Sequence, residues 1–147
     1  MQDRLKDEMK QAMRDREKVR LGTIRLILAA IKQREVDERI VLDDQQVLIV
    51  LDKMQKQRRE SIRQYRDASR EDLVAVEEAE GLIIQEFLPQ ALTEEEISSM
   101  VKAAIADSSA GSIKDMGKVM AILKPAMQGR ADMAVVSVKI KELLVGT

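Results

Sequence analysis

Apolar residues recur at three- and four-residue intervals along almost the whole chain, which is the spacing of one face of an α-helix. A clear run is formed by Leu21, Ile24, Leu28 and Ile31, and it is widened by Ile27, Ala29 and Ala30. A widened stripe predicts a helix with several neighbours, so we expect residues 16–39 to form the central helix of a bundle. Strand-favouring aromatic residues are nearly absent, since Tyr65 and Phe87 are the only two. We therefore predict an all-α protein.

Four helices are predicted before Pro89. The first covers about 2–15, the second 16–39, the third begins at a cap on Asp43 or Asp44 and ends near 67, and the fourth follows a capping-box-like sequence at 69–72. The residues expected to point inward are Leu5, Met9 and Met13 in the first helix, Val47, Leu51, Met54, Ile62 and Tyr65 in the third, and Leu73, Val76, Ala79, Ile83 and Phe87 in the fourth. The residue before a proline avoids helical geometry, so Leu88-Pro89 should end the fourth helix.

Three shorter helices are predicted after Pro89. Thr93 to Glu96 is a capping box, and residues 108–112 have the composition of a loop. The glycine at 129 should end the second of these helices, and the aspartate at 132 should cap the third. The inward residues are expected to be Ile97, Val101, Ala104, Ile105, Met116, Val119, Met120, Leu123, Met127, Val136, Ile140, Leu143 and Leu144. We thus expect an N-terminal helical domain at 1–89 and a small three-helix tail domain at 90–147.

The chain lacks the side chains on which most catalysis depends. It contains no histidine and no cysteine, which removes the usual general base and the commonest metal and thiolate ligands. Ser108, Ser109 and Lys114 resemble the serine and lysine chemistry of amidases only faintly, and Asp43 with Asp44 has no histidine partner for metal binding. We predict no catalytic residue, no metal site and no cofactor.

Two features bear on localisation. No apolar run approaches the roughly 20 residues that cross a bilayer. The first eight residues are too charged to contain the apolar core of a signal peptide. The expectation is a cytoplasmic protein that does not enter a membrane.

The chain as a whole has a net charge of −1, which argues against indiscriminate coating of nucleic acid. One basic cluster lies on the third predicted helix and consists of Lys53, Lys56, Arg58, Arg59, Arg63 and Arg66. Arginine suits phosphate oxygens. The favoured interpretation is nevertheless a solvated face with ion pairs to the acidic helices.

A second basic cluster lies between 111 and 142. Its cations are Lys114, Lys118, Lys124, Arg130, Lys139 and Lys141, and only Asp115, Asp132 and Glu142 oppose them. Two helices and a glycine turn carry these charges, an arrangement that can meet a phosphate backbone. The alternative is an ordinary solvated surface.

Several elements in fixed order resemble the GatB/YqeY family. In the tail they are Asp115-Met-Gly-Lys-Val-Met120, Leu123-Lys-Pro125, Gly129-Arg-Ala-Asp132, Val135-Val136 and Ile140-Lys-Glu-Leu-Leu144. Upstream they are Met9-Lys-Gln-Ala-Met13, Arg20-Leu-Gly-Thr-Ile-Arg-Leu-Ile27, Arg58-Arg-Glu-Ser61, Arg70-Glu-Asp-Leu73 and Phe87-Leu-Pro-Gln90. The resemblance covers essentially the whole chain and implies a four-helix part followed by a three-helix tail.

The resemblance also implies a function. In the family's glutamine-dependent tRNA amidotransferases the tail helps to hold tRNA, while glutamine hydrolysis and amide transfer belong to other domains. By carry-over, Lys118 and the turn at 129–132 occupy motif positions. Arg130 of that turn and Lys118 are therefore expected RNA contacts, and Lys114, Lys124 and Lys139 are added because of their charge. Gly117 and Gly129 are expected to serve close helix packing and a positive-φ turn instead.

Three functions remain open on this basis. The leading one is a tRNA-binding accessory protein without activity of its own. The second is a protein–protein adaptor that docks on aminoacylation or amidotransferase proteins through the methionine-rich tail or the bundle. The third is a glutamine-dependent carbon–nitrogen ligase, as family membership implies.

Overall fold

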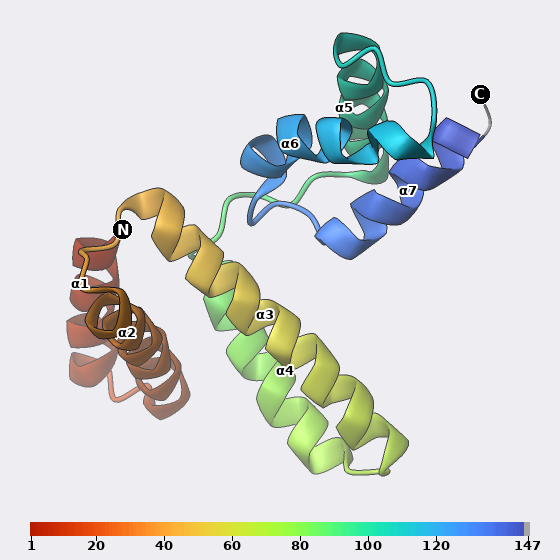
Figure 1. Ribbon diagram of the computed structural model, residues 1–147. Coiled ribbons are helices and arrows are strands. Elements are labelled where there is room, and N and C mark those ends of the chain that lie inside the picture. Colours follow the sequence, from red (N-terminus) through yellow and green to blue (C-terminus); the bar gives the residue numbers. More distant parts are fainter. Residues whose placement is uncertain (146–147) are drawn as a thin grey trace. The chain divides into compact units, whose positions relative to one another are not determined.

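The structure is a computed structural model that describes residues 1–145, and within them it contains seven α-helices, one short 3₁₀ helix and no strand (Figure 1). The elements are α1 (Gln2–Arg14), α2 (Lys18–Glu38), α3 (Asp44–Asp67), α4 (Glu71–Gln85), α5 (Glu94–Asp107), η1 (Ile113–Asp115), α6 (Met116–Met127) and α7 (Met133–Val145). The prediction of an all-α protein is confirmed. The chain divides into two compact units, Met1–Pro89 and Gln90–Thr147.

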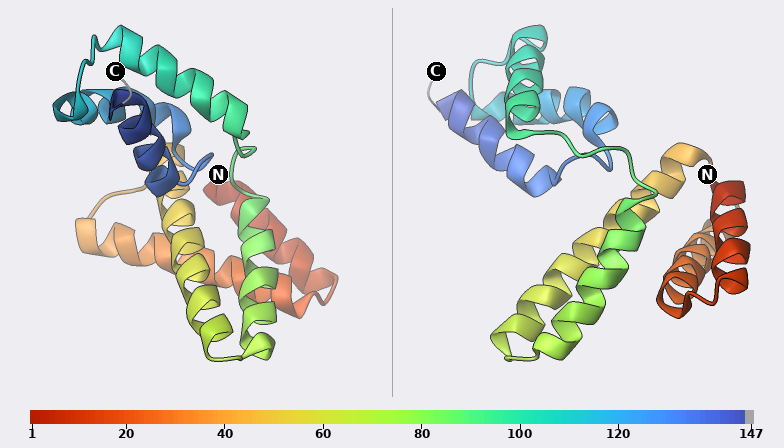
Figure 2. Two further views of the ribbon diagram at one scale, coloured as in Figure 1. Left: turned by 90° about the vertical axis from the view of Figure 1, so that its right-hand side faces the viewer. Right: turned by 180° about the vertical axis from the view of Figure 1, so that it is seen from behind.

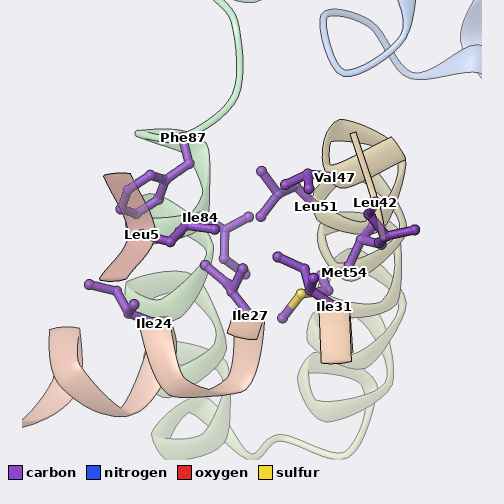
Figure 3. Packing of buried hydrophobic residues seen from close by; sticks show 11 residues of the cluster. Leu5, Ile24, Ile27, Ile31, Leu42, Val47, Leu51, Met54, Ile84 and Phe87 are labelled. Atoms are coloured by element: carbon purple, nitrogen blue, oxygen red, sulfur yellow. The ribbon is translucent and has the colours of Figure 1, made fainter. Parts of the chain in front are cut away.

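The core of the first unit takes residues from all four of its helices. Figure 3 shows Leu5 of α1, Ile27 of α2, Leu51 of α3 and Ile84 of α4 converging with Phe87, and all five are at most 1% exposed. Helix α2 buries Thr23, Ile24, Ile27 and Ile31. It contacts α1, α3 and α4, so its predicted central position is confirmed. Met13, which was expected inside, is 51% exposed because Ala12 takes the buried position in that turn of α1.

Helices α3 and α4 run side by side (Figure 2), and polar pairs join them beyond the core. The Gln55 amide donates to the Gly81 carbonyl at 2.9 Å, and Arg58 forms an ion pair with Glu80 at 2.9 Å. Arg66 pairs with Glu78 at 3.0 Å and Arg63 pairs with Glu60 within α3 at 2.6 Å. The favoured interpretation of the α3 cations, a solvated face with ion pairs to the acidic helices, is confirmed for Arg66. Arg58 also pairs with α4 but is largely buried, and Arg63 pairs within its own helix.

Helix starts follow the sequence at three of the four predicted caps. The Asp132 carboxylate caps α7, where it accepts a hydrogen bond from the Ala134 amide at 3.0 Å. Asp43 caps α3 with Gln46, and Thr93 caps α5 with Glu96. The predicted cap at Ser69 is wrong. Ser69 has a left-handed φ of 58° and belongs to the turn that ends α3, where the next amide donates to the Tyr65 carbonyl at 2.8 Å. The N-cap of α4 is Arg70, whose side chain makes no capping bond.

The predicted inner face of α4 is partly wrong. Val74 and Ile84 are buried, whereas Val76 is 53% exposed and Ala79 is exposed. Helix α4 carries apolar residues on more than one face, so spacing alone could not select the face that packs. Phe87 is buried as expected, although it lies beyond the last helical residue, Gln85.

The second unit is a smaller core enclosed by α5, α6 and α7. Val101, Val119, Met127, Val136 and Ile140 are fully buried there. The turn between α6 and α7 contains Gly129 with a φ of 76°, so the prediction of a positive-φ glycine is confirmed. Among residues 1–145, no helix combines the length and the apolar content that crossing a membrane needs.

Candidate nucleic-acid interface

Helix α6 has one buried face and one solvent face. Val119, Leu123 and Met127 point into the core of the second unit. Lys118 and Lys124 lie outside that buried stripe, on different sides of the solvent face, and both are exposed. Lys114 is exposed on the preceding η1 turn. The structure thus brings three of the five predicted RNA contacts onto one continuous η1–α6 segment.

Small residues lie between these lysines on the solvent face. Gly117 and Ala121 are both exposed. A Cβ atom added at Gly117 would have no neighbouring atom within 4 Å, so the prediction that Gly117 serves close helix packing is wrong. The backbone here is open to an incoming group, and lysines border it at 114, 118 and 124.

Asp115 organises the start of this segment, a role that sequence patterning did not single out. Its carboxylate accepts a hydrogen bond from the Gly111 amide at 3.0 Å and lies 3.7 Å from the Lys118 ammonium. The Gly111 hydrogen bond, with help from the Lys118 charge, lowers the pKa of Asp115. The carboxylate therefore stays ionised and holds the loop before η1. The pair with Lys118 is long, and solvent-exposed pairs of this kind contribute little to stability.

Arg130 has a different environment from the three lysines. It is half-buried in the α6–α7 turn, and its Nε donates to the Gln90 carbonyl at 3.1 Å. Its own carbonyl accepts a hydrogen bond from the Leu92 amide at 2.8 Å. These bonds tie residues 90–92 to the turn, so Arg130 has a structural role that its charge alone did not indicate. Lys139 is half-buried on α7, away from the η1–α6 segment in sequence.

The serines and the aspartate that were weighed as catalytic or metal-binding residues have structural roles. The Ser108 hydroxyl donates to the Ile105 carbonyl at 3.2 Å, and Ser109 adopts a left-handed φ of 55° at the end of α5. The Asp43 carboxylate caps α3. Over residues 1–145, no three acidic side chains are grouped in a way that could hold a metal ion.

The fold and this surface define an all-α protein with a lysine-bearing helical tail unit. The chain belongs to the YqeY family, because the family model described as Yqey-like protein matches residues 2–144. The resemblance seen in the sequence motifs is thereby confirmed for this family.

Curated fungal proteins are similar to the chain. The protein called altered inheritance of mitochondria protein 41, mitochondrial, of Pyrenophora tritici-repentis is 34% identical over 144 residues, which cover 96% of this chain and 79% of that protein. Its namesake in Meyerozyma guilliermondii is 38% identical over 84 residues, which cover 57% of this chain and 44% of the relative. An uncharacterized protein of Schizosaccharomyces pombe is 31% identical over 86 residues, which cover 58% of this chain and 70% of that protein.

These names correct the expectation of a cytoplasmic protein, which is wrong, because the relatives with the shared name are designated mitochondrial. An apolar core marks secretory signal peptides, whereas segments that direct proteins to mitochondria are amphipathic and rich in arginine. The lack of an apolar segment is therefore uninformative about mitochondria.

Proposed function

We propose that the second unit binds the sugar-phosphate backbone of folded RNA, with tRNA as its ligand, through the η1–α6 segment. The observation that carries the proposal is the exposure of Lys114, Lys118 and Lys124 around the open backbone at Gly117. A phosphate can approach such a surface closely while ammonium groups flank it. The Asp115 carboxylate fixes the loop that precedes these groups.

Composition favours recognition of backbone and shape over recognition of bases. Proteins that hold unpaired bases stack them on aromatic rings. The two aromatic residues of this chain, Tyr65 and Phe87, both belong to the first unit. Contacts to phosphates and 2′-hydroxyls suit a largely double-helical RNA such as tRNA.

The alternatives receive less support. An adaptor surface made of tail methionines loses its basis because Met127 is fully buried, and Met116 and Met120 pack against the core. The carbon–nitrogen ligase alternative has no histidine or cysteine to act as general base or nucleophile. The names of the relatives state an organelle and an inheritance phenotype and no ligand.

A pair of matched double variants tests the proposal. Lys114→Gln/Lys118→Gln removes two charges from the η1–α6 segment, whereas Lys53→Gln/Lys56→Gln removes two exposed charges from α3. At about 0.1 M salt, the first variant should bind tRNA at least roughly tenfold more weakly than the wild type, because two phosphate contacts are lost. Fluorescence anisotropy with labelled tRNA measures this. Equal affinities for the two variants would refute the proposed surface.

A further inference from the structure

Helix α2 has a second apolar face that the core does not use. Its inner face is buried, yet Val19, Leu26 and Val36 on the outer face are 59%, 49% and 60% exposed. Gly22, Ala29 and Gln33 lie between them, and all three are exposed. The six residues follow one another at steps of three and four, so they form a single stripe along the helix. We call the set 19, 22, 26, 29, 33 and 36 the outer stripe.

The outer stripe contains two small residues among larger ones. Gly22 lies between Val19 and Leu26, and Ala29 lies between Leu26 and Gln33. A Cβ atom added at Gly22 would meet nothing within 4 Å, so the surface has an open gap there. Gaps between ridges of larger side chains are the features into which another helix inserts its own side chains. A flat lipid surface has no such side chains to insert.

One edge of the outer stripe is basic. Lys18, Arg25 and Lys32 follow one another at seven-residue intervals and are all exposed. On the same side a groove of about 440 Å³ separates α1 from α2, with Met9 and Leu28 among its lining residues. Lys6 and Lys10 of α1 add two more cations to this groove. Figure 2 shows α1 and α2 as an antiparallel pair.

These cations form no close ion pair within residues 1–145, in contrast to the arginines of α3. The acidic residue in the groove, Glu35, accepts hydrogen bonds from the Leu42 amide at 2.9 Å and the Gln2 amide at 3.2 Å. These hydrogen bonds lower the pKa of Glu35, and the charges of Lys32 and Lys6 act on its carboxylate in the groove and help to lower it. The surface therefore has excess positive charge beside exposed apolar side chains.

We infer that this surface of α1 and α2 binds an acidic amphipathic helix of a partner protein. The apolar side chains of the partner would lie on the outer stripe, and its carboxylates would face the basic edge. Nucleic acid fits less well, because exposed valine and leucine offer nothing to phosphates. A second copy fits less well too, since two α2 helices packed antiparallel would set their basic edges against each other. The inference concerns the first unit and does not depend on RNA binding by the second.

A synthetic helix tests the inference directly. The probe is a peptide as long as α2, with leucine and alanine along one stripe and glutamate on both flanks, labelled for fluorescence anisotropy. A second peptide replaces the glutamates with lysines. The wild-type protein should bind the glutamate peptide at least about tenfold more tightly than the lysine peptide.

Three variants separate the features of the surface, and a fourth is the control. Arg25→Glu/Lys32→Glu should weaken binding of the glutamate peptide at least about tenfold and reverse the preference between the peptides. Gly22→Leu should weaken it by filling the gap, and Leu26→Gln by removing an apolar contact. Lys53→Glu/Lys56→Glu makes the same charge change on α3 and should bind within about twofold of the wild type. Circular dichroism confirms that each variant folds.

Several results would overturn the inference. One is the absence of binding between wild-type protein and the glutamate peptide, and another is an equal loss in the α3 control. Vesicles of phosphatidylserine and phosphatidylcholine, and tRNA, provide two further arms. If either binds in a way that Arg25→Glu/Lys32→Glu abolishes while the peptide does not bind, the surface has a different ligand. Self-association in sedimentation velocity that Leu26→Gln abolishes would assign the stripe to a second copy.

Discussion

Gly22 and Gly129 show how differently one residue type can act in this chain. Gly22 lies inside α2 with open space around its Cβ position, whereas Gly129 has a φ of 76° and is buried in the α6–α7 turn. Helical backbone suits alanine, and left-handed backbone does not. The same substitution at the two positions should therefore change the free energy of unfolding in opposite directions.

Gly22→Ala should raise the free energy of unfolding by about 0.5–1 kcal/mol, because alanine restricts the unfolded chain and favours the helix. Gly129→Ala should lower it by about 1–2 kcal/mol, because a Cβ atom is strained at this φ. Urea unfolding followed by circular dichroism measures both. Two shifts of the same sign would contradict the backbone assignments.

Glu35 gives the first unit a pH-dependent contribution to stability. The hydrogen bond from the Leu42 amide, aided by the Gln2 side chain, lowers the pKa of Glu35. A carboxyl with a lowered folded-state pKa stabilises the fold above its unfolded pKa, near pH 4.3, and loses this contribution as the pH falls through the folded value. Glu35→Gln should therefore have a lower Tm than the wild type at pH 7, and the difference should vanish in acid. A difference that is constant from pH 7 to pH 3 would contradict this.

Individual residues show which features could be predicted from the sequence and which could not. The left-handed turn at Gly129 was predictable, because glycine between two helical patterns has few other uses. The hydrogen bond from Arg130 to Gln90 was not, because it joins residues 40 positions apart in sequence. The family motif and its charge therefore grouped Arg130 with Lys118, although its Nε donates a hydrogen bond to a backbone carbonyl.

At the scale of helices, caps were predictable where the side chains satisfy the helix amides directly. Thr93 and Glu96 do so at α5, with the Glu96 amide donating to the Thr93 hydroxyl at 3.1 Å. Ser69 stands near the start of α4 but belongs to the turn that ends α3. A sequence pattern cannot show whether a residue between two adjacent helices ends the first helix or caps the second. The face of α4 that packs against the core could not be predicted either, because this helix has apolar residues on more than one face.

A pair of cap variants tests this distinction. Thr93→Ala should lower the free energy of unfolding by about 1 kcal/mol, because the Glu96 amide loses its acceptor. Ser69→Ala should change it by less than about 0.5 kcal/mol, since no capping bond is lost. Thermal unfolding of both variants at one pH compares them. A loss at Ser69 equal to the loss at Thr93 would show that Ser69 does cap α4.

At the scale of the whole molecule, each unit has its own core and its own basic surface. The first unit has an apolar stripe with cations beside it, which suits a helix. The second has cations around exposed small residues, which suits a phosphate backbone. Sequence motifs indicated the second surface because three of its lysines lie within eleven residues, 114–124. The surface of the first unit could not be recognised from the sequence. Helix α2 has apolar residues on both sides, and only the packed structure shows which side stays exposed.

The central claim is that the η1–α6 segment contacts phosphates of RNA, and the salt dependence of tRNA affinity tests it most directly. The logarithm of the association constant should fall linearly with the logarithm of salt concentration for the wild type. For Lys118→Gln the slope should be smaller by about one unit, since one phosphate contact is removed, whereas Lys53→Gln should keep the wild-type slope. A wild-type affinity that does not change with salt, or a Lys118→Gln slope equal to that of the wild type, would contradict the claim.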